Sequence, residues 1–248
     1  MKYTVLSLFP KLIDSFFSLS IPAKAVTRGI IEYQCVNIRD FALDKHKVCD
    51  DAPFGGGAGM LMKSEPLGRA LESVNVFGKG GTKTVVYLSP AGKVFNQTIA
   101  AELAQKKELV LICGHYEGID QRIIDVFVDQ ELSIGDYVLS SGETAALVVI
   151  DATFRLVETV IKSESLCEES FQNGLLEYPQ YTRPEFYKSR AVPQVLMSGH
   201  HEHIRTWRLK KRVEKTLTVR PDLIERGTFD GEVQTFIKEI KNERNKND

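Results

Sequence analysis

Four short apolar runs in the first part of the chain constrain its fold more than any other feature. They cover residues 3–8, 84–89, 108–113 and 137–139. Runs of this kind are typical of buried strands, and segments with room for helices lie between them, such as residues 96–106 and 142–150. The alternation predicts an α/β fold in which helices cover both faces of a largely parallel sheet.

The composition excludes several classes of protein. The 248 residues are 43% hydrophobic, and 32 Lys plus Arg nearly balance 33 Asp plus Glu, so neither wholesale disorder nor a uniformly charged chain is indicated. The sequence has neither the features of a signal peptide nor an apolar run of about 18 residues. We therefore expect a cytoplasmic protein with no membrane contact. The four cysteines are far apart, which argues against a zinc ribbon or a disulfide scaffold: Cys35, Cys49, Cys113 and Cys167.

The last third of the chain becomes polar and then basic. Residues 161–174 are rich in Ser and Glu, which is typical of a linker or mobile loop. Residues 181–220 contain ten Lys or Arg and three Glu, so this stretch carries +7 and the other 208 residues carry −8. We expect three parts: a domain over residues 1–160, a linker over 161–175 and a basic helical domain over 176–248.

A helix is expected over residues 200–218 of the basic domain. Leu209, Val213 and Leu217 fall on one stripe of this helix, which would face a core. Four basic residues fall on a separate stripe: Arg205, Arg208, Arg212 and Lys215. The alternative to a phosphate-binding face is a solvated helix whose charges only keep it soluble. The regional charge favours phosphate binding.

Glycine-containing segments close two of the apolar runs and flank a third, and open α/β sheets bind ligands at strand ends. These loops, at residues 88–92, 113–120 and 133–143, could converge on one pocket. Another glycine loop, at residues 52–60, lacks the Gly-Lys-Ser/Thr ending of a phosphate loop and the spacing of a dinucleotide fingerprint. We interpret it as a flexible loop over a substrate. His200, His201 and His203 have no further ligands at matching spacing, so no metal site is assigned.

A set of short motifs occurs in a fixed order along nearly the whole chain. It includes Ser7-Leu8-Phe9-Pro10, the glycine loop, Tyr87-Leu88-Ser89-Pro90, Cys113-Gly114, Tyr116-Glu117-Gly118-Ile119-Asp120, Ser133-Ile134-Gly135-Asp136-Tyr137, Tyr181-Thr182-Arg183-Pro184 and Ser198-Gly199-His200-His201. This ordered set resembles the bacterial tRNA (guanine-N1)-methyltransferases, the TrmD family, which modify the guanine at tRNA position 37, beside the anticodon.

The resemblance implies a SPOUT-type parallel sheet with a deep trefoil knot, a small C-terminal helical domain and a homodimer. It also implies that S-adenosylmethionine binds to the knot loops and that tRNA is the partner. The cofactor is expected against thirteen residues: Tyr87, Leu88, Ser89, Pro90, Gly114, Tyr116, Glu117, Gly118, Ile134, Gly135, Tyr137, Leu139 and Gly142. Contacts to tRNA are expected from Arg183, His201, Arg205, Arg208, Arg212 and Lys215.

A catalytic pair is implied as well. Arg155 matches the family's arginine, which would stabilise the negative charge that develops at guanine O6 as N1 loses its proton. The family's catalytic aspartate stands immediately before Ser-Phe, and this chain has Glu169 at that position. The segment from Arg155 to Ser170 is also one residue shorter than in the family, so the longer side chain of glutamate is expected to reach the same point. We assign the base to Glu169, with Glu168 as the alternative.

Two further positions depart from the family, which commonly has arginine where this chain has His115 and histidine where it has Gln180. Magnesium is often associated with the family, and Glu117 is a candidate carboxylate ligand, but no dedicated ligand cage is visible in the sequence. Two alternative functions stay open. One is a tRNA-binding relative that has lost methyl transfer, and the other is a SPOUT methyltransferase that acts on another position.

Overall fold

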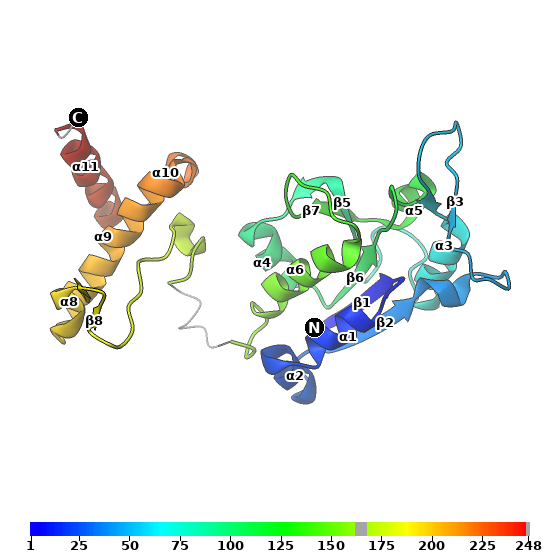
Figure 1. The fold of residues 1–248 in the computed structure, drawn as a ribbon, viewed down its shortest axis with the longest axis horizontal. Coiled ribbons are helices and arrows are strands. Elements are labelled where there is room, and N and C mark those ends of the chain that lie inside the picture. The colour runs from blue at the N-terminus through cyan, green and yellow to red at the C-terminus, as the bar shows by residue number, and fades with distance from the viewer. Residues whose placement is uncertain (162–167, 247–248) are drawn as a thin grey trace. The chain divides into compact units, whose positions relative to one another are not determined.

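The computed structural model describes residues 1–161 and 168–246 of the chain. The chain divides into two compact units, Met1–Ile161 and Lys162–Asp248, which Figure 1 shows in colours running along the sequence. The predicted linker over 161–175 lies partly outside the described residues, and residues 168–175 belong to the second unit. No helix in the described part of the chain is long and apolar enough to cross a membrane.

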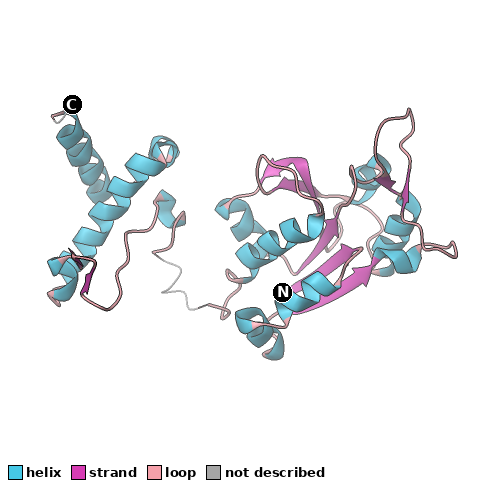
Figure 2. Cartoon of the chain, viewed as in Figure 1, coloured by secondary structure: helices cyan, strands magenta, loops and turns pink. Residues whose placement is uncertain are grey.

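The first unit is built on a five-stranded parallel sheet, which confirms the α/β prediction (Figure 2). Its strand order is β2-β1-β6-β5-β7. The strands are β1 (Lys2–Ser7), β2 (Glu32–Asn37), β5 (Thr84–Val94), β6 (Glu108–Cys113) and β7 (Gln130–Ser133). The expectation of a strand at residues 137–139 is wrong, because this run is an exposed loop and the fifth strand precedes it.

Side chains alternate between two cores along the strands, because successive residues of a strand point to opposite faces. In β6, Leu109 and Leu111 join one core, whereas Val110 and Ile112 join the other. The first core includes residues of α1 (Lys11–Phe17), α2 (Ser20–Thr27), α4 (Gln97–Ala104) and α6 (Gly142–Phe154). The second includes residues of α3 (Ser64–Ser73), α5 (Gln121–Phe127) and the short helix η1 (Ile38–Phe41).

Strand β5 is interrupted where it passes β7. Leu88 and Lys93 both pair with Leu132, so residues 89–92 form an extra loop within the strand. After this loop the chain comes back close to β7 at Gly92. A Cβ at this position would lie 2.4 Å from the backbone nitrogen of Leu132, so only glycine allows this approach. The sheet edge therefore carries a local projection.

The glycine loop lies outside the sheet. It connects β3 (Asp50–Asp51) to β4 (Leu61–Met62), which pair in antiparallel fashion. The side chain of Phe54 within it is fully exposed. The base of the loop contacts the segment that follows β6, since Met62 N donates a hydrogen bond of 2.9 Å to Gly118 O.

The second unit is mainly helical. The predicted helix over 200–218 is confirmed as α9 (His201–Val219), and it packs with α8 (Gln194–Met197), α10 (Pro221–Arg226) and α11 (Gly231–Asn245). The core of the unit contains Leu175, Val213, Leu217, Val233 and Ile240, with Leu209 packed against it. A short hairpin, β8 (Phe186–Tyr187) with β9 (Arg190–Ala191), and the short helix η2 (Gln172–Gly174) complete it.

Candidate functional site

A cavity of about 350 Å³ opens at the carboxyl ends of β5, β6 and β7. Four stretches line it: the projection of β5, the loop after β6, the loop after β7 and the first residues of α6. All thirteen residues that the sequence assigns to the cofactor lie in its wall: Tyr87, Leu88, Ser89, Pro90, Gly114, Tyr116, Glu117, Gly118, Ile134, Gly135, Tyr137, Leu139 and Gly142. The three loops expected to converge therefore do so.

The start of α6 is joined closely to the loop after β6. Gly142 N donates a 2.8 Å hydrogen bond to Gly114 O, and His115 forms a β-bridge with Ser141. A Cβ on Gly142 would lie 2.6 Å from Gly114 N, a distance that no side chain tolerates. Only glycine allows this approach, and it brings two walls of the cavity together.

A buried polar group lies behind this junction. Glu143 is only 1% exposed, and its Oε1 accepts a 2.5 Å hydrogen bond from Ser7 Oγ. Its Oε2 lies 3.3 Å from Nε2 of His115. The carboxylate thus connects the ends of β1 and β6 to the first turn of α6, where a negative charge also complements the helix dipole.

The loop after β7 contributes an apolar wall that is open to solvent. Tyr137, Val138 and Leu139 are exposed, Val138 to 85%, although large apolar side chains are usually covered in a folded protein. Backbone polar groups of the glycine-containing segments lie beside them. Apolar surface with a few polar groups is typical of a small-molecule site, and a lining of this mixed character is compatible with S-adenosylmethionine.

Two tyrosines differ in how they border the cavity. Burial, with a smaller effect of the Glu131 carboxylate, raises the pKa of Tyr87 to about 12, so its hydroxyl stays neutral. Tyr116 is half exposed, has a positive φ of 58° and donates a 3.2 Å hydrogen bond to Asp50. Burial and the Asp50 carboxylate raise the pKa of Tyr116. The loop after β6 is therefore attached to the base of the glycine loop.

The described residues do not fit a magnesium site at Glu117. The Oε2 of Glu117 accepts a 2.7 Å hydrogen bond from Met60 N, so the carboxylate holds the end of the glycine loop. No group of three or more His, Cys, Asp or Glu in the described part of the chain is arranged to hold a metal ion.

The two expected catalytic residues lie in different units. Arg155 is the C-terminal cap residue of α6 and is half-buried. Glu169 belongs to the second unit, just before the segment that packs on α9, and is also half-buried. Its neighbour Glu168 accepts a 2.9 Å hydrogen bond from the hydroxyl of Tyr178 and lies 3.5 Å from Arg208. Glu168 is thus fixed to α9.

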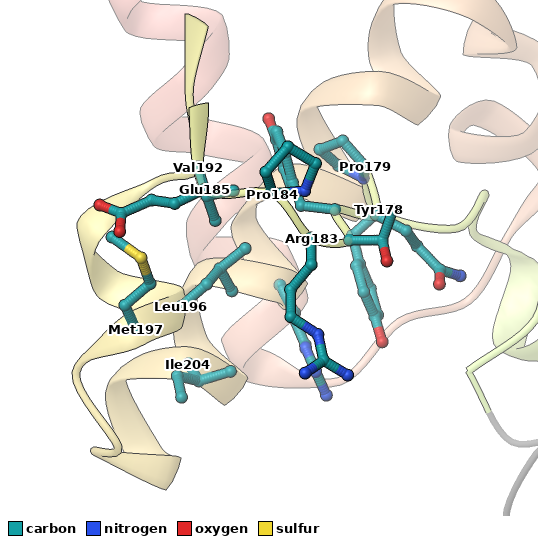
Figure 3. A pocket seen from close by; sticks show the side chains of 13 residues that line it. Tyr178, Pro179, Arg183, Pro184, Glu185, Val192, Leu196, Met197 and Ile204 are labelled. Carbon is teal, nitrogen blue, oxygen red and sulfur yellow. The ribbon is translucent and has the colours of Figure 1, made fainter. Parts of the chain in front are cut away.

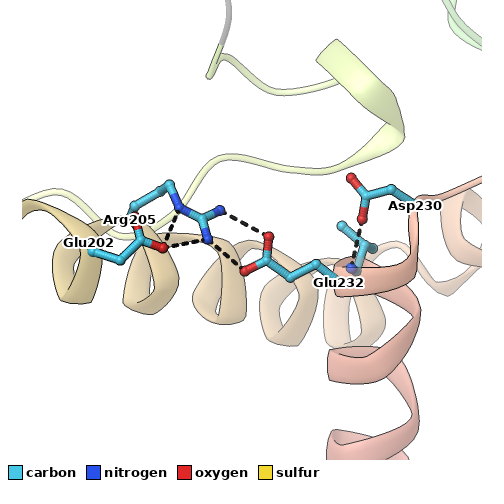
Figure 4. Close-up of polar contacts among 5 residues, drawn as sticks. Glu202, Arg205, Asp230 and Glu232 are labelled. Atoms are coloured by element: carbon cyan, nitrogen blue, oxygen red, sulfur yellow. Dashed lines mark hydrogen bonds and ion pairs between the residues drawn. The ribbon is translucent and has the colours of Figure 1, made fainter.

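Fewer cations are available on the expected basic face of α9 than helical spacing indicates. Arg205 is held by two carboxylates, because it donates hydrogen bonds to Glu202 and Glu232 (Figure 4). Arg212 is only 8% exposed and donates from Nε to Leu176 O at 3.2 Å. Lys215, His201 and Arg183 are exposed.

The structure adds seven residues to the cavity wall that the sequence did not single out as cofactor contacts: His115, Leu132, Ser133, Val138, Ser140, Ser141 and Ala145. All of them stand beside or between residues that were assigned. Their position within the same glycine-containing loops was the signal that could have found them.

Comparisons with known proteins agree over nearly the whole length. The family model described as tRNA (Guanine-1)-methyltransferase TrmD matches residues 1–226. A protein of Treponema denticola named tRNA (guanine-N(1)-)-methyltransferase is 58% identical over 247 residues, which are 98% of this chain and 100% of the relative. A protein of the same name from Treponema pallidum is 58% identical over 97% of this chain and 96% of its own. Another, from Borreliella burgdorferi, is 57% identical over 90% of this chain and 92% of its own. The chain therefore belongs to the TrmD family of tRNA (guanine-1)-methyltransferases.

Proposed function

We propose that this protein transfers a methyl group from S-adenosylmethionine to N1 of the guanine at position 37 of tRNA. The observation that carries the proposal is the convergence on one cavity, at the ends of parallel strands, of the thirteen residues that the family resemblance assigns to the cofactor. The relatives' names specify the base and the atom. Position 37, beside the anticodon, comes from the resemblance of the motifs.

The chemistry requires a base and a group that stabilises negative charge. Guanine N1 carries a proton that must leave as its lone pair forms the new bond, and S-adenosylmethionine supplies the electrophilic methyl group. We assign proton acceptance to the carboxylate of Glu169, a step worth roughly 10²- to 10⁴-fold in rate. The guanidinium of Arg155 would stabilise the charge that develops toward guanine O6.

The contacts of Glu168 argue against it as the base. The Oε2 of Glu168 already accepts a hydrogen bond from Tyr178 and lies beside the cation of Arg208. A carboxylate with a hydrogen-bond donor and a cation as neighbours is a weaker proton acceptor. The assignment leaves Glu168 as a residue that fastens the segment before Leu175 to α9.

The arrangement of subunits around the target base is inferred from the same family resemblance. We propose a cytoplasmic homodimer in which the trefoil knot of one subunit and the segment around Glu169 of the other enclose the target base. A target guanine would leave its stack to reach the cavity, as in other enzymes that do chemistry on a base. The exposed cations of the second unit would bind the phosphates of the anticodon arm.

Product analysis tests the proposal directly. Purified protein would be incubated with labelled S-adenosylmethionine and unmodified tRNA transcripts that carry guanine or adenine at position 37, and the nucleosides would then be identified. We expect 1-methylguanosine from the guanine transcript alone. Binding of tRNA without any product would indicate a relative that has lost methyl transfer, whereas a methylated ribose or another base would indicate a different SPOUT activity.

A further inference from the structure

A second cavity, of about 1050 Å³, lies entirely within the helical unit (Figure 3). Residues 178–185 form one side, and α8 and the first turns of α9 form the other. Its volume is slightly above the range for small-molecule sites, about 300–1,000 Å³. None of its lining residues belongs to the cofactor cavity.

Aliphatic side chains line one side of this second cavity. They are Val192 after β9, Leu196 and Met197 of α8, and Ile204 of α9. All four are only partly covered or exposed. An apolar surface of this kind favours a flat, weakly hydrated group over a bare ion.

Two arginines border the cavity and differ in how they are held. The guanidinium of Arg208 lies 4.8 Å from the ring centroid of Tyr178 and 3.5 Å from the Glu168 carboxylate, which fixes its plane. Arg183 is exposed and has no hydrogen bond or ion pair with any other described residue. A fixed guanidinium plane provides a stacking surface, and a cation without a partner is suited to a phosphate.

The acidic residue of the cavity lies away from these cations. Figure 3 shows the Glu185 carboxylate and the Arg183 guanidinium pointing to opposite sides of the cavity. Charge is therefore divided, and the cation of Arg208 lies beside the ring of Tyr178. Tyr181 is 49% exposed and can present its ring to a ligand.

We propose that this cavity, the Tyr181–Arg208 cavity, binds one unstacked nucleotide of an RNA loop, with its base among Tyr181, Arg208 and the aliphatic wall and its phosphate on Arg183. Aromatic rings and guanidinium planes are the surfaces on which single-stranded RNA bases stack. The surrounding stretch, residues 181–220, carries +7, which is complementary to a polyanion. The inference rests on the proposed function only in taking the RNA to be tRNA.

The chain has a built-in reporter for this cavity. Trp207 is its single tryptophan, and its ring centroid lies 6.4 Å from that of Tyr181. A base that stacks on Tyr181 would change the surroundings of the indole. Tryptophan emission can therefore follow occupation of the Tyr181–Arg208 cavity without any label and without methyl transfer.

The experiment titrates the full-length protein with an RNA hairpin that carries the anticodon stem and loop. The same hairpin is then prepared with one abasic nucleotide at each loop position in turn, the target guanine excepted. We expect the intact hairpin to change tryptophan emission, and one abasic position to weaken binding at least fivefold and abolish the change. Equal binding by every abasic hairpin would show that phosphates alone are recognised and would overturn the proposal.

Variants locate the effect. We expect Tyr181→Ala and Arg183→Ala each to lower hairpin affinity at least fivefold, and Tyr181→Phe, which keeps the ring, to retain it. Arg190→Ala is the matched control, because Arg190 is an exposed arginine of the nearby hairpin that does not line the cavity. Equal losses of hairpin affinity for Arg183→Ala and Arg190→Ala would overturn the assignment. Tryptophan emission that does not change on hairpin binding, as when a second copy of the chain covers the cavity, would also overturn it.

The outcome is separable from that of the proposed function. Absence of 1-methylguanosine would refute methyl transfer at N1 and leave hairpin binding to be measured by emission. Normal methylation with an unresponsive tryptophan would refute the nucleotide site and leave the enzyme assignment intact.

Discussion

Nε2 of His115 lies 3.3 Å from Oε2 of Glu143 in the interior of the first unit, where the two residues are 9% and 1% exposed. Together with the hydrogen bond from Ser7, this contact fixes the loop after β6 to α6. We expect Glu143→Ala to lower the free energy of unfolding by roughly 2–4 kcal/mol, since it leaves buried polar groups without a partner. Urea denaturation would measure it. Glu143→Gln, which keeps an acceptor for Ser7, should cost less, and equal costs would contradict the role of the acceptor.

The contact between Gly142 and Gly114 predicts a loss of cofactor binding in Gly142→Ala. The added Cβ would lie 2.6 Å from Gly114 N and 2.8 Å from the Cα of Cys113, so two cavity walls must separate. We expect S-adenosylmethionine affinity to fall at least about tenfold, and stability by roughly 1–3 kcal/mol. Calorimetric titration would check this. Gly231→Ala is the control, because a Cβ on Gly231 meets nothing within 4 Å, and it should leave cofactor affinity unchanged.

The two adjacent glutamates should differ sharply in catalysis. Glu169→Gln is expected to slow single-turnover methyl transfer by roughly 10²- to 10⁴-fold, with little change in S-adenosylmethionine affinity. Glu168→Gln should have a much smaller effect on that rate, because the carboxylate of Glu168 already accepts a hydrogen bond from the Tyr178 hydroxyl and is a weaker proton acceptor. If Glu168→Gln proved the slower variant, the base would have to be reassigned to Glu168.

The cations of α9 should contribute unequally to tRNA binding. Lys215 is exposed, so Lys215→Ala should weaken binding and reduce the slope of log affinity against log salt by about one. Hydrogen bonds to Glu232 and Glu202 raise the pKa of Arg205 and engage its charge. Arg205→Gln should therefore change the salt slope less. Filter binding at several salt concentrations would compare them, and a larger change for Arg205→Gln would exclude this order.

Acid stability of the first unit should depend on Glu108. Burial alone would raise the pKa of this carboxyl, but hydrogen bonds from Thr4 and Lys83, with the charges of Lys83 and Lys2, hold the pKa below its usual value. A lowered folded pKa stabilises the protein above the unfolded value, about 4.3, and this contribution is lost as the pH falls.

Glu108→Gln tests this dependence. Urea denaturation between about pH 6 and pH 3 should show a smaller decrease in stability for Glu108→Gln than for the unaltered protein. Glu102→Gln serves as the control, since Glu102 is exposed on α4. An identical pH dependence for Glu108→Gln and the unaltered protein would refute the contribution of Glu108.

Spacing patterns in the sequence were sufficient to predict the core-facing side of helix α9. The core stripe of α9 follows from helical spacing, and Val213 and Leu217 are indeed buried. The run at residues 137–139 misled because it is apolar for a different reason: its side chains line a cavity instead of a core. The spacing of apolar residues cannot distinguish a buried strand from a loop that lines a cavity, since both contain apolar side chains.

Features that depend on distant parts of the chain were not predictable in this way. The burial of Arg212 arises because Leu176 lies against α9 and presents its carbonyl oxygen. Likewise, the pairing of His115 with Glu143 joins residues from different elements that no local motif connects. The residues expected to contact the cofactor were named from the ordered motifs of a family, not from periodicity, and the structure shows that they line one cavity.

The projection of β5 has a consequence for the stability of one wall of the cavity at the carboxyl ends of β5, β6 and β7. Its residues, 89–92, are flanked on both sides by positions that pair with β7, since Leu88 and Lys93 share the partner Leu132. Local fraying of this wall therefore requires the edge of the sheet to separate as well, and amide protons in β7 and in the wall should exchange with solvent at a common rate. The loop after β7, by contrast, belongs to no strand of the sheet in the described part of the chain, so the wall formed by residues 89–92 is constrained by strand pairing and the wall formed by that loop is not.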